Sequence, residues 1–457
     1  MRQEPQVKVG ILSAGSISFT LTGIFTLPSG EITEGRQLAT VSESGLGVLW
    51  NGVTYPSLDF EPTSYSGDTF ELEGVTIGVD FHWERKENQR FRGGLRIIAE
   101  NGKLTAINIV SIEDYLVSVI SSEMSSTSSL PLLQAHAVIS RSWVMSMIER
   151  SAKPLPLNGA QAELRALNPG PSLIRYWDRE DHLNFDVCAD DHCQRYQGVT
   201  RIATSIAASA VADTRGEVLT YKGKLCDARF SKCCGGVFEV FETCWDDQPR
   251  PYLQARRDGT DQFDFPNLRD EDKACDWIMD SPEAFCNTSD KRILSQVLNG
   301  YDRETPDFFR WEESLSQEKI SRLVASRIGE DLGEIIDLQP LTRGTSGRIR
   351  ELKIIGTKGE RIIGKELMIR RALSESHLYS SAFTVEKIYP KNDTYVAEGQ
   401  NPTNRPRVPE KFILHGAGWG HGVGLCQIGA AIMGERGYSY SEILRHYYPS
   451  TDLTRLY

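Results

Sequence analysis

Apolar and polar residues alternate along much of the first part of the chain. The alternating runs are VKVGIL at 7–12, ISFTLTGIF at 17–25, GVTIGVDF at 74–81 and GLRIIAE at 94–100, and turn residues separate them. A period of two places successive side chains on opposite faces of a half-buried strand. Residues 1–110 are therefore predicted to form a β-rich N-terminal unit.

The apolar residues adopt a helical period after residue 110. They recur at Ile112, Tyr115, Leu116, Val119 and Ile120. Ser111 and Asp114 form an S-x-x-D start signal for this helix. A serine-rich stretch at 121–129 favours caps and turns, and Pro131 suits the first turn of a second apolar helix. Two helices joined by a polar connection are expected here.

The remainder of the chain mixes both periods. The alanine-rich stretch Val199–Thr214 predicts a helix, and 217–245 returns to strand patterns that turn at Gly235 and Gly236. A helical stretch at 316–328 follows, and residues 346–370 predict a hairpin turning at Thr357–Gly359. The order of β, α, β, mixed, β and α segments predicts the α+β class.

Composition and charge exclude several classes of partner. The chain has 457 residues, 40% of them hydrophobic, and a formal net charge of -11. Nucleic acid and anionic lipid both attract a basic face, so neither is an expected partner. No apolar run is long enough to span a bilayer, and the start MRQEPQVKVG lacks the apolar core of a signal peptide. Either the protein is cytosolic or a leader has been removed.

Nine cysteines lie in this chain, an odd number that leaves at least one thiol outside any disulfide. Cys233 with Cys244, and Cys275 with Cys286, are spaced for local disulfides if the compartment is oxidising.

One carboxylate lies where the first predicted helix ends. Glu123 follows the apolar face of that helix and precedes Met124 on the connection to the second helix. A carboxyl group half desolvated by apolar neighbours resists ionisation, which suits a general acid working near neutral pH. Glu123 is therefore the candidate catalytic acid, and the alternative is an ordinary solvated residue of a last helical turn.

A cluster of metal-ligand residues lies between 182 and 193. It comprises His182, Cys188, His192 and Cys193. Two thiolates and two imidazoles make a tetrahedral zinc set, and a site closed by four protein ligands is structural. The alternative is two surface histidines beside two unrelated thiols.

A glycine-rich segment, HGAGWGHGVGLCQIGA at 415–430, carries Trp419, His421 and Gln427. Glycines permit positive φ angles and close approach of the backbone, so a ligand can lie against this loop. An aromatic face beside a polar groove suits a sugar ring, and the three side chains are candidate substrate contacts. The alternative is a tight glycine hairpin at a sheet corner.

Several motifs together resemble the family of stage II sporulation protein D and LytB-type proteins. They are EDYLVSVISSEM, LPLLQAHAVISRSWV, DVCADDHCQRYQG, ATSIAASAVADTRGEVLTY, FSKCCGGVFE, SGRIRELKIIG, GWGHGVGLCQIGA and HYYP. The chain departs from the family pattern at Ala135-His136-Ala137, where A-Q-A is usual, at Cys426 and Ile428 in the glycine loop, and in its additional cysteines. These departures leave Glu123 in place but put substrate contacts near the loop in doubt.

The resemblance implies a lytic transglycosylase, a carbon–oxygen lyase that cleaves peptidoglycan glycan strands with Glu123 as the essential acid. It also implies structural zinc at the His/Cys cluster, and a location outside the cytoplasm if a leader was removed. Arg141 is a candidate either to fix the helix of Glu123 or to contact a muramyl carboxylate. Two other classes remain open: a non-catalytic, glycan-binding activator of cell-wall amidases, and a metallohydrolase with catalytic zinc.

These expectations divide the chain into four parts. Residues 1–110 form the β-rich unit, 111–255 a catalytic core with the zinc cluster, and 256–345 a mixed insertion. Residues 346–457 supply strands and the glycine loop that complete the core.

Overall fold

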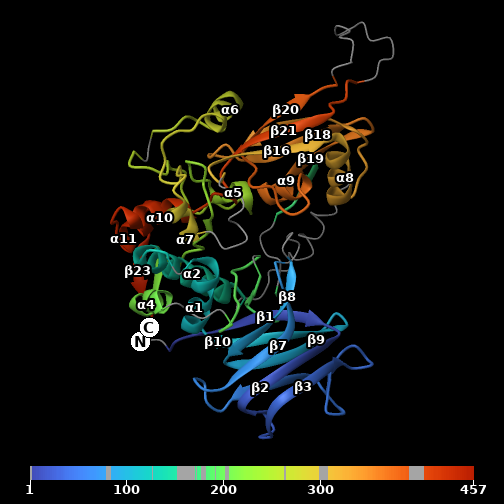
Figure 1. Ribbon diagram of the computed structural model, residues 1–457, viewed down its shortest axis with the longest axis vertical. Helices are drawn as coiled ribbons and strands as arrows, with labels where there is room; N and C mark the ends of the chain where they lie inside the picture. Colours follow the sequence, from blue (N-terminus) through green and yellow to red (C-terminus); the bar gives the residue numbers. More distant parts are fainter. Residues whose placement is uncertain are drawn as a thin grey trace.

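The computed structural model describes residues 3–78, 84–125, 127–151, 170, 172–176, 182–190, 192–200, 205–261, 264–297, 307–390 and 406–457 (Figure 1). The architecture is α+β with a β-rich N-terminal part. In Figure 1 the N-terminal sheet lies at one end, a second group of sheets at the other, and helices α1, α2 and α4 near the middle. Within the described residues, no helix has the length and apolar character needed to cross a bilayer.

The N-terminal strands form one large twisted sheet. They are β1 (Gln6–Ala14), β2 (Ser16–Thr26), β3 (Ile32–Val41), β4 (Val48–Trp50), β5 (Val53–Tyr55), β6 (Ser57–Pro62), β7 (Thr69–Ile77), β8 (Arg85–Arg92), β9 (Gly94–Glu100) and β10 (Lys103–Ser111). The order is β12-β1-β10-β9-β6-β2-β3-β4-β5, with β7 and β8 branching from β2. Alternate residues point inward, so Phe19 and Phe60 meet with ring centroids 5.3 Å apart. The predicted β-rich unit is confirmed.

The edge strand of this sheet belongs to the His/Cys segment. Strand β12 (Val187–Cys188) pairs in parallel with β1, matching Val9 to Val187 and Gly10 to Cys188. Position 10 requires a glycine, because the ring of Phe185 occupies the space where a Cβ atom would lie. The sheet therefore fixes the position of Cys188.

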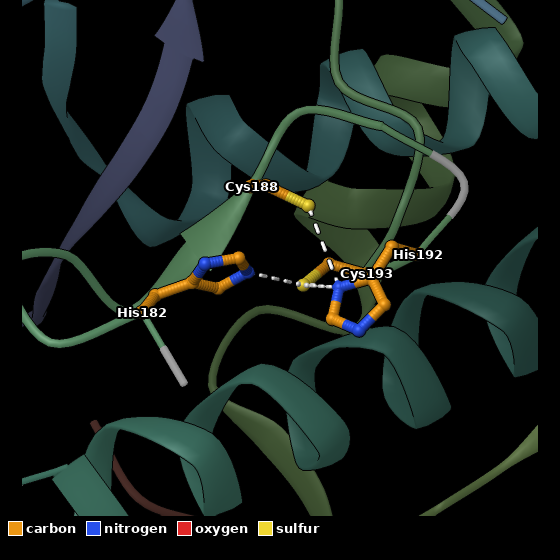
Figure 2. A group of neighbouring side chains, drawn as sticks. All are labelled: His182, Cys188, His192 and Cys193. Carbon is orange, nitrogen blue, oxygen red and sulfur yellow. Dashed lines mark hydrogen bonds between the residues drawn. The ribbon is translucent and has the colours of Figure 1, made fainter. Parts of the chain in front are cut away.

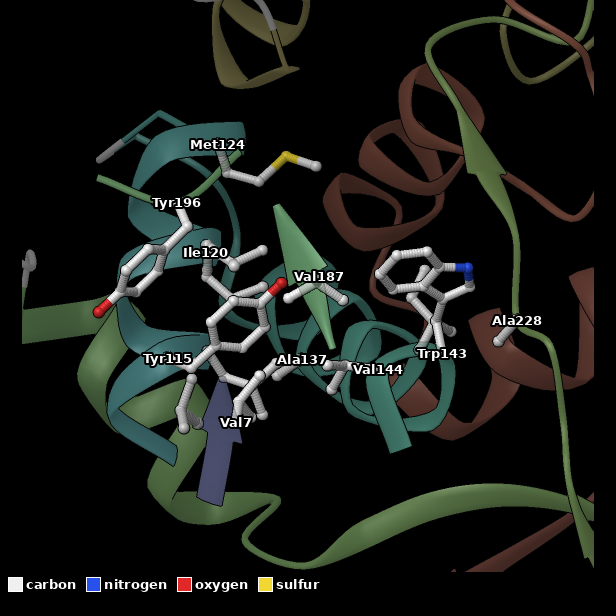
Figure 3. Close-up of a cluster of buried hydrophobic side chains, with 14 of the residues drawn as sticks. Val7, Tyr115, Ile120, Met124, Ala137, Trp143, Val144, Val187, Tyr196 and Ala228 are labelled. Atoms are coloured by element: carbon white, nitrogen blue, oxygen red, sulfur yellow. The ribbon is translucent and has the colours of Figure 1, made fainter. Parts of the chain in front are cut away.

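Both predicted helices after residue 110 are present. Helix α1 (Ile112–Glu123) begins at Ser111, whose side chain accepts the backbone N–H of Asp114 at 3.3 Å. Helix α2 (Leu130–Ser151) follows the serine-rich turn. Figure 3 shows Tyr115, Ile120 and Ala137 in the shared core of these helices.

Further elements surround these two helices. They are α4 (Ser205–Asp213) and the strands β13 (Glu217–Tyr221), β14 (Lys224–Leu225) and β23 (Asp452–Arg455), which pair in the order β14-β13-β23. The helix predicted over Val199–Thr214 begins at Ser205 among the described residues, and 201–204 lie outside them. Strand β15 (Phe230–Ser231) pairs in parallel with β22 (Leu425–Cys426). The short helix α5 (Phe241–Cys244) follows β15 in the chain, where the pattern predicted only strands.

A second hydrophobic core holds two small sheets and two helices. Its elements are β11 (Ser172–Ile174), β16 (Arg310–Ser316), β17 (Ile335–Arg343), β18 (Ile349–Gly356), β19 (Gly359–Gly364), β20 (Phe383–Ile388), β21 (Lys411–Ala417), α8 (Gln317–Ile328) and α9 (Glu366–Ala372). The predicted hairpin is confirmed as β18–β19, where Gly356 pairs with Gly359. The core runs from Trp311 to Leu414, and so crosses the boundary that the sequence suggested at residue 345.

The remaining helices lie around the glycine loop. They are α6 (Glu271–Met279), α7 (Lys291–Val297), α10 (Gln427–Glu435) and α11 (Tyr440–Tyr447). Helices α10 and α11 and strand β22 contribute to the same core as α1 and α2. Segments from both ends of the chain therefore enclose the two helices.

Candidate functional site

Glu123 is the last residue of α1 and is half-buried. Its Oε1 accepts the backbone N–H of Arg195 at 3.2 Å. Within the described part of the chain, Oε2 accepts no hydrogen bond and no lysine or arginine pairs with the carboxylate. One oxygen is thus held in place, and the other has no protein partner among the described residues.

The turn after Glu123 is fixed by a distant segment. The Met124 N–H closes the helix on Ile120 O at 3.0 Å, and Met124 then adopts an extended backbone. Gln296 of α7 provides its backbone oxygen to Ser125 N at 2.9 Å and to Ser128 Oγ at 2.8 Å. The expected polar connection between the helices is therefore an ordered turn.

Arg141 holds the other end of the same helix. It is fully buried, and its Nε and Nη2 donate to the two oxygens of Glu113 at 3.0 and 2.7 Å. Its Nη1 donates to the backbone oxygen of Glu217 at 3.0 Å. These donors are occupied inside the protein, and Arg141 fixes the helix that carries Glu123. The contact of Arg141 with a muramyl carboxylate stays a prediction.

The predicted metal ligands come together in space (Figure 2). Cys193 Sγ lies 3.5 Å from His182 Nε2 and 3.5 Å from His192 Nδ1, and Cys188 Sγ lies 3.7 Å from the same His192 nitrogen. The four ligand atoms all lie within 4.8 Å of one another. A tetrahedral zinc ion with ordinary bond lengths would hold its sulfur and nitrogen ligands about 3.6 Å apart. The arrangement therefore fits zinc.

The two thiols of the cluster differ in how readily they ionise. The hydrogen bond from Cys193 is the main cause that lowers the pKa of Cys188 well below its ordinary value. The same bond is the main cause that raises the pKa of Cys193. Cys188 is thus the thiolate of the pair, and thiolates are the form that binds zinc.

The segment after the cluster connects it to Glu123. Gln194 Oε1 accepts the hydroxyl of the buried Tyr115 on α1 at 3.2 Å, and Tyr115 stacks on Tyr196 with ring centroids 5.2 Å apart. Arg195 lies between these two anchored residues and donates to Glu123. Tyr115 thus anchors both neighbours of Arg195, whose N–H holds the carboxylate two residues after Cys193.

The glycine loop is occupied by the protein itself. Gly418, Gly420, Gly422 and Gly424 all have positive φ angles between 73 and 87°. A side chain at Gly422 would collide with the guanidinium of Arg348, whose Nε donates to Gly420 O at 3.0 Å. The expected backbone groove for a ligand is not formed at Gly422, because Arg348 fills that space.

The three candidate sugar contacts on this segment differ in exposure. Trp419 is half-buried and stacks on Phe308 with centroids 4.7 Å apart. Gln427 is 2% exposed, and its amide nitrogen lies 3.1 Å from His136 Nε2. The side chain of Gln427 therefore contacts the protein interior, and its contact with a sugar stays a prediction.

His421 is also partly enclosed. Its Nδ1 accepts the backbone N–H of Val423 at 3.0 Å, and its ring meets Trp245 edge-on at 4.7 Å. Burial, and then the charge of Arg229, lower the pKa of His421 well below 6.5. His421 is therefore neutral, and no contact among the described residues joins His421 or Trp419 to Glu123.

Two features of the site leave no recognisable signal in the sequence. The Arg195 contact uses a backbone group, so the residue type carried no signal. Arg229 lies over the ring of Trp245 at 4.4 Å, and its charge acts on both Cys193 and His421. The positive charge of Arg229 therefore lies near both the His/Cys cluster and the glycine loop.

All nine cysteines carry free thiols, including those expected in local disulfides. Cys286 lies 3.5 Å from Cys234, and Cys275 approaches Glu271. The predicted pairing of Cys275 with Cys286 is therefore wrong in this structure, as is that of Cys233 with Cys244.

Comparison with known proteins places the site in a family. The family model for stage II sporulation protein matches residues 100–221, and a domain of unknown function matches 239–424. The amidase enhancer of Bacillus subtilis is 30% identical over 54% of this chain, but the match spans only 32% of that relative.

Two further relatives align over most of the chain. An uncharacterized protein of Brachyspira hyodysenteriae is 25% identical over 92% of this chain and 82% of its own length. Stage II sporulation protein D of Bacillus amyloliquefaciens is 21% identical over 76% of both chains. The segment matched by the sporulation model contains Glu123 and all four residues of the His/Cys cluster. These matches support the family of stage II sporulation protein D and LytB-type proteins for this chain.

Proposed function

We propose that this protein cleaves peptidoglycan glycan strands as a lytic transglycosylase, with Glu123 as the catalytic acid and base. The observation that carries the proposal is the half-buried Glu123 carboxylate, of which Arg195 N–H holds one oxygen at 3.2 Å. Within the described residues the other oxygen has no protein partner. The names of the relatives support a role in cell-wall processing outside the cytoplasm.

One carboxyl group suffices for this reaction. Ordinary glycoside hydrolysis uses two carboxylates that flank the bond. Here protonated Glu123 donates its proton to the oxygen between N-acetylmuramic acid and N-acetylglucosamine, and the bond from that oxygen to C1 breaks. The resulting carboxylate removes the proton of the muramic acid C6 hydroxyl, whose oxygen bonds to C1. A 1,6-anhydro ring forms, no water is consumed, and Glu123 regains its proton.

The rest of the chain positions this group. The Arg141–Glu113 pair anchors the start of α1, and Gln296 holds the turn beyond Glu123. His182, Cys188, His192 and Cys193 would hold a zinc ion, which supplies a structural crosslink and leaves no open coordination position for chemistry. Trp419 and His421 stay candidate sugar contacts.

An amidase activator is the second candidate. The matched relative named amidase enhancer favours a protein that binds glycan and stimulates a cell-wall amidase without cutting the strand itself. The two candidates differ in what purified protein does alone. A transglycosylase produces new 1,6-anhydromuramyl ends without an amidase, whereas an activator produces none.

The deciding experiment digests denuded glycan strands with purified protein. Mass spectrometry is expected to detect 1,6-anhydromuramyl ends with the wild type, and Glu123→Gln should reduce them by about 10³-fold or more, since the proton donor of the reaction is lost. Glu149→Gln is the matched control, because Glu149 is exposed on α2. It should leave the rate unchanged.

The result can contradict the proposal in two ways. Anhydro ends that persist in Glu123→Gln would remove Glu123 from the mechanism. No anhydro ends from denuded strands with the wild type, together with faster cleavage of intact, peptide-bearing peptidoglycan by an added amidase, would instead establish the activator.

A further inference from the structure

We propose that the protein holds a second, fully buried zinc ion between Cys234, Asp258, Cys286 and Cys426. The candidate ligand atoms of these residues all lie within 4.8 Å of one another. Their exposed fractions are 2, 0, 1 and 0%. The proposal is independent of the proposed transglycosylase activity, because none of the four residues contacts Glu123 or the His/Cys cluster.

Four separate segments supply the ligands. Cys234 follows β15, and Cys426 ends β22, the strand that pairs with β15. Asp258 lies in the chain before α6, and Cys286 lies between α6 and α7. Side chains from such distant positions meet here because the fold brings them together, so chance proximity along the sequence does not explain the cluster.

The distances fit a single metal ion. Cys234 Sγ lies 3.5 Å from Cys286 Sγ and 3.4 Å from Asp258 Oδ2. A tetrahedral zinc ion would hold two sulfur ligands about 3.8 Å apart, and a sulfur and an oxygen ligand about 3.6 Å apart. A disulfide would instead bring two sulfurs to about 2.05 Å. The separations are therefore those of ligands around an ion.

Hydrogen bonds orient the carboxylate for this role. Asp258 Oδ1 accepts the hydroxyl of Tyr447 at 3.0 Å and lies 3.3 Å from His446 Nε2. The other oxygen, Oδ2, faces Cys234 Sγ. Carboxylates that bind metals are commonly held through their second oxygen in this way.

Backbone donors point at the sulfurs. The N–H of Cys234 donates to Cys426 Sγ at 3.3 Å, and the N–H of Gly236 donates to Cys234 Sγ at 3.4 Å. Such donors stabilise negative charge on sulfur, and thiolates are the form in which cysteine binds zinc. These backbone donors therefore favour the thiolate forms of Cys234 and Cys426.

Positive charge surrounds the cluster but does not reach the ligand atoms. Arg310 Nη1 donates to Gly235 O at 3.2 Å, and Arg348 Nη1 donates to Cys234 O at 3.1 Å. No lysine or arginine of the described residues forms an ion pair with Asp258. His446 Nε2 is the basic group that pairs with Asp258, 3.3 Å from Oδ1. A divalent ion would in addition place positive charge between Oδ2 and the three sulfurs.

The softness of the ligands selects the metal. Three thiolates with one carboxylate suit zinc and disfavour magnesium or calcium, which take oxygen ligands. Four protein ligands leave no position for substrate, so the ion is structural. Its effect is to join the segments around residues 234, 258, 286 and 426.

Metal analysis of the full chain tests the proposal. Protein purified without added metal is expected to contain two zinc ions per chain, one for each cluster. Cys286→Ser and Cys193→Ser should each contain one, and Cys275→Ser, which alters a thiol outside both clusters, should contain two. The second site would be overturned if the wild type contained a single zinc ion that Cys193→Ser lost and Cys286→Ser kept. Finding iron in place of zinc would also overturn it.

A second measurement does not depend on folded variants. Wild-type protein is denatured with a chelator, alkylated without a reductant and weighed by mass spectrometry. All nine cysteines should react if the buried cluster binds metal as thiolates. Two fewer alkylated cysteines, restored by a reductant and mapped to any pair that includes Cys234, Cys286 or Cys426, would identify a disulfide and overturn the proposal.

Discussion

The two clusters of metal-ligand residues are built in opposite ways. The His/Cys cluster takes its ligands from one segment, His182 to Cys193, and lies half-exposed beside the end of α1. The buried cluster takes Cys234, Asp258, Cys286 and Cys426 from four segments and excludes solvent. A local cluster shapes one loop, whereas a dispersed cluster joins distant parts of the fold. We therefore expect the first to control activity and the second to control stability.

The largest expected effect is on stability, and it separates the clusters directly. Cys426→Ser should lower the free energy of unfolding by about 3–5 kcal/mol, since it removes one partner from a buried charged group and loosens the bound ion. Cys188→Ser should cost only about 1 kcal/mol, within the range of an ordinary substitution. Denaturation by guanidinium chloride measures both. Equal losses in the two variants would remove the distinction.

A second prediction concerns the contact between α2 and the segment next to the buried cluster. His136 is fully buried, and burial, aided by the charge of Lys232, lowers its pKa from 6.5 to about 3. Its imidazole meets Gln427, the residue that follows Cys426. Since the unfolded chain binds the proton more readily, this group stabilises the fold above pH 6.5, and the contribution is lost as the pH falls towards 3.

The effect of His136 can be isolated by substitution. Between pH 7 and pH 5, the wild type should lose about 2 kcal/mol more stability than His136→Gln, which keeps a polar side chain but has no proton to gain. Urea unfolding at the two pH values, with metal content checked at each, provides the measurement. Parallel losses in both proteins would show that His136 does not titrate on unfolding.

The smallest expected effect concerns activity and tests the other half of the comparison. His192→Ala should lower the rate of glycan cleavage about tenfold, because loss of a ligand loosens the segment that holds Arg195 N–H against Glu123. The free energy of unfolding should change by about 1 kcal/mol or less. Cleavage rates and denaturant unfolding curves, measured on the same preparations of the wild type and of His192→Ala, check both expectations. An unchanged rate would separate the His/Cys cluster from the site of Glu123.

Much of the fold was predictable because its signals are local. Ser111 begins α1 through a side-chain cap, and the β18–β19 hairpin follows from alternation around a short turn. The extent of the second core was not predictable, since β16 pairs with β21 across about a hundred residues of chain. Helix α5 was missed because short apolar runs do not distinguish a strand from a buried helix.

In the candidate site, too, features with a local sequence signal were predictable and those that depend on distant contacts were not. The His/Cys cluster was visible because its four ligands share one short segment. The interior partners of Arg141 and Gln427 were not predictable, because polar residue types do not say whether they face solvent or the interior. The buried cluster left no pattern in the sequence, since pairing of β15 with β22 is what brings Cys426 to Cys234.

The wide spacing of the buried ligands also sets an order of events in time. All four residues of the His/Cys cluster are present once the chain has been made to residue 193, so they can capture an ion while later segments are still unfolded. The buried cluster lacks its last ligand until Cys426 has joined β15 through β22. Its ion can therefore enter only late in folding and leave only as fast as the protein opens, which protects it kinetically from competing chelators.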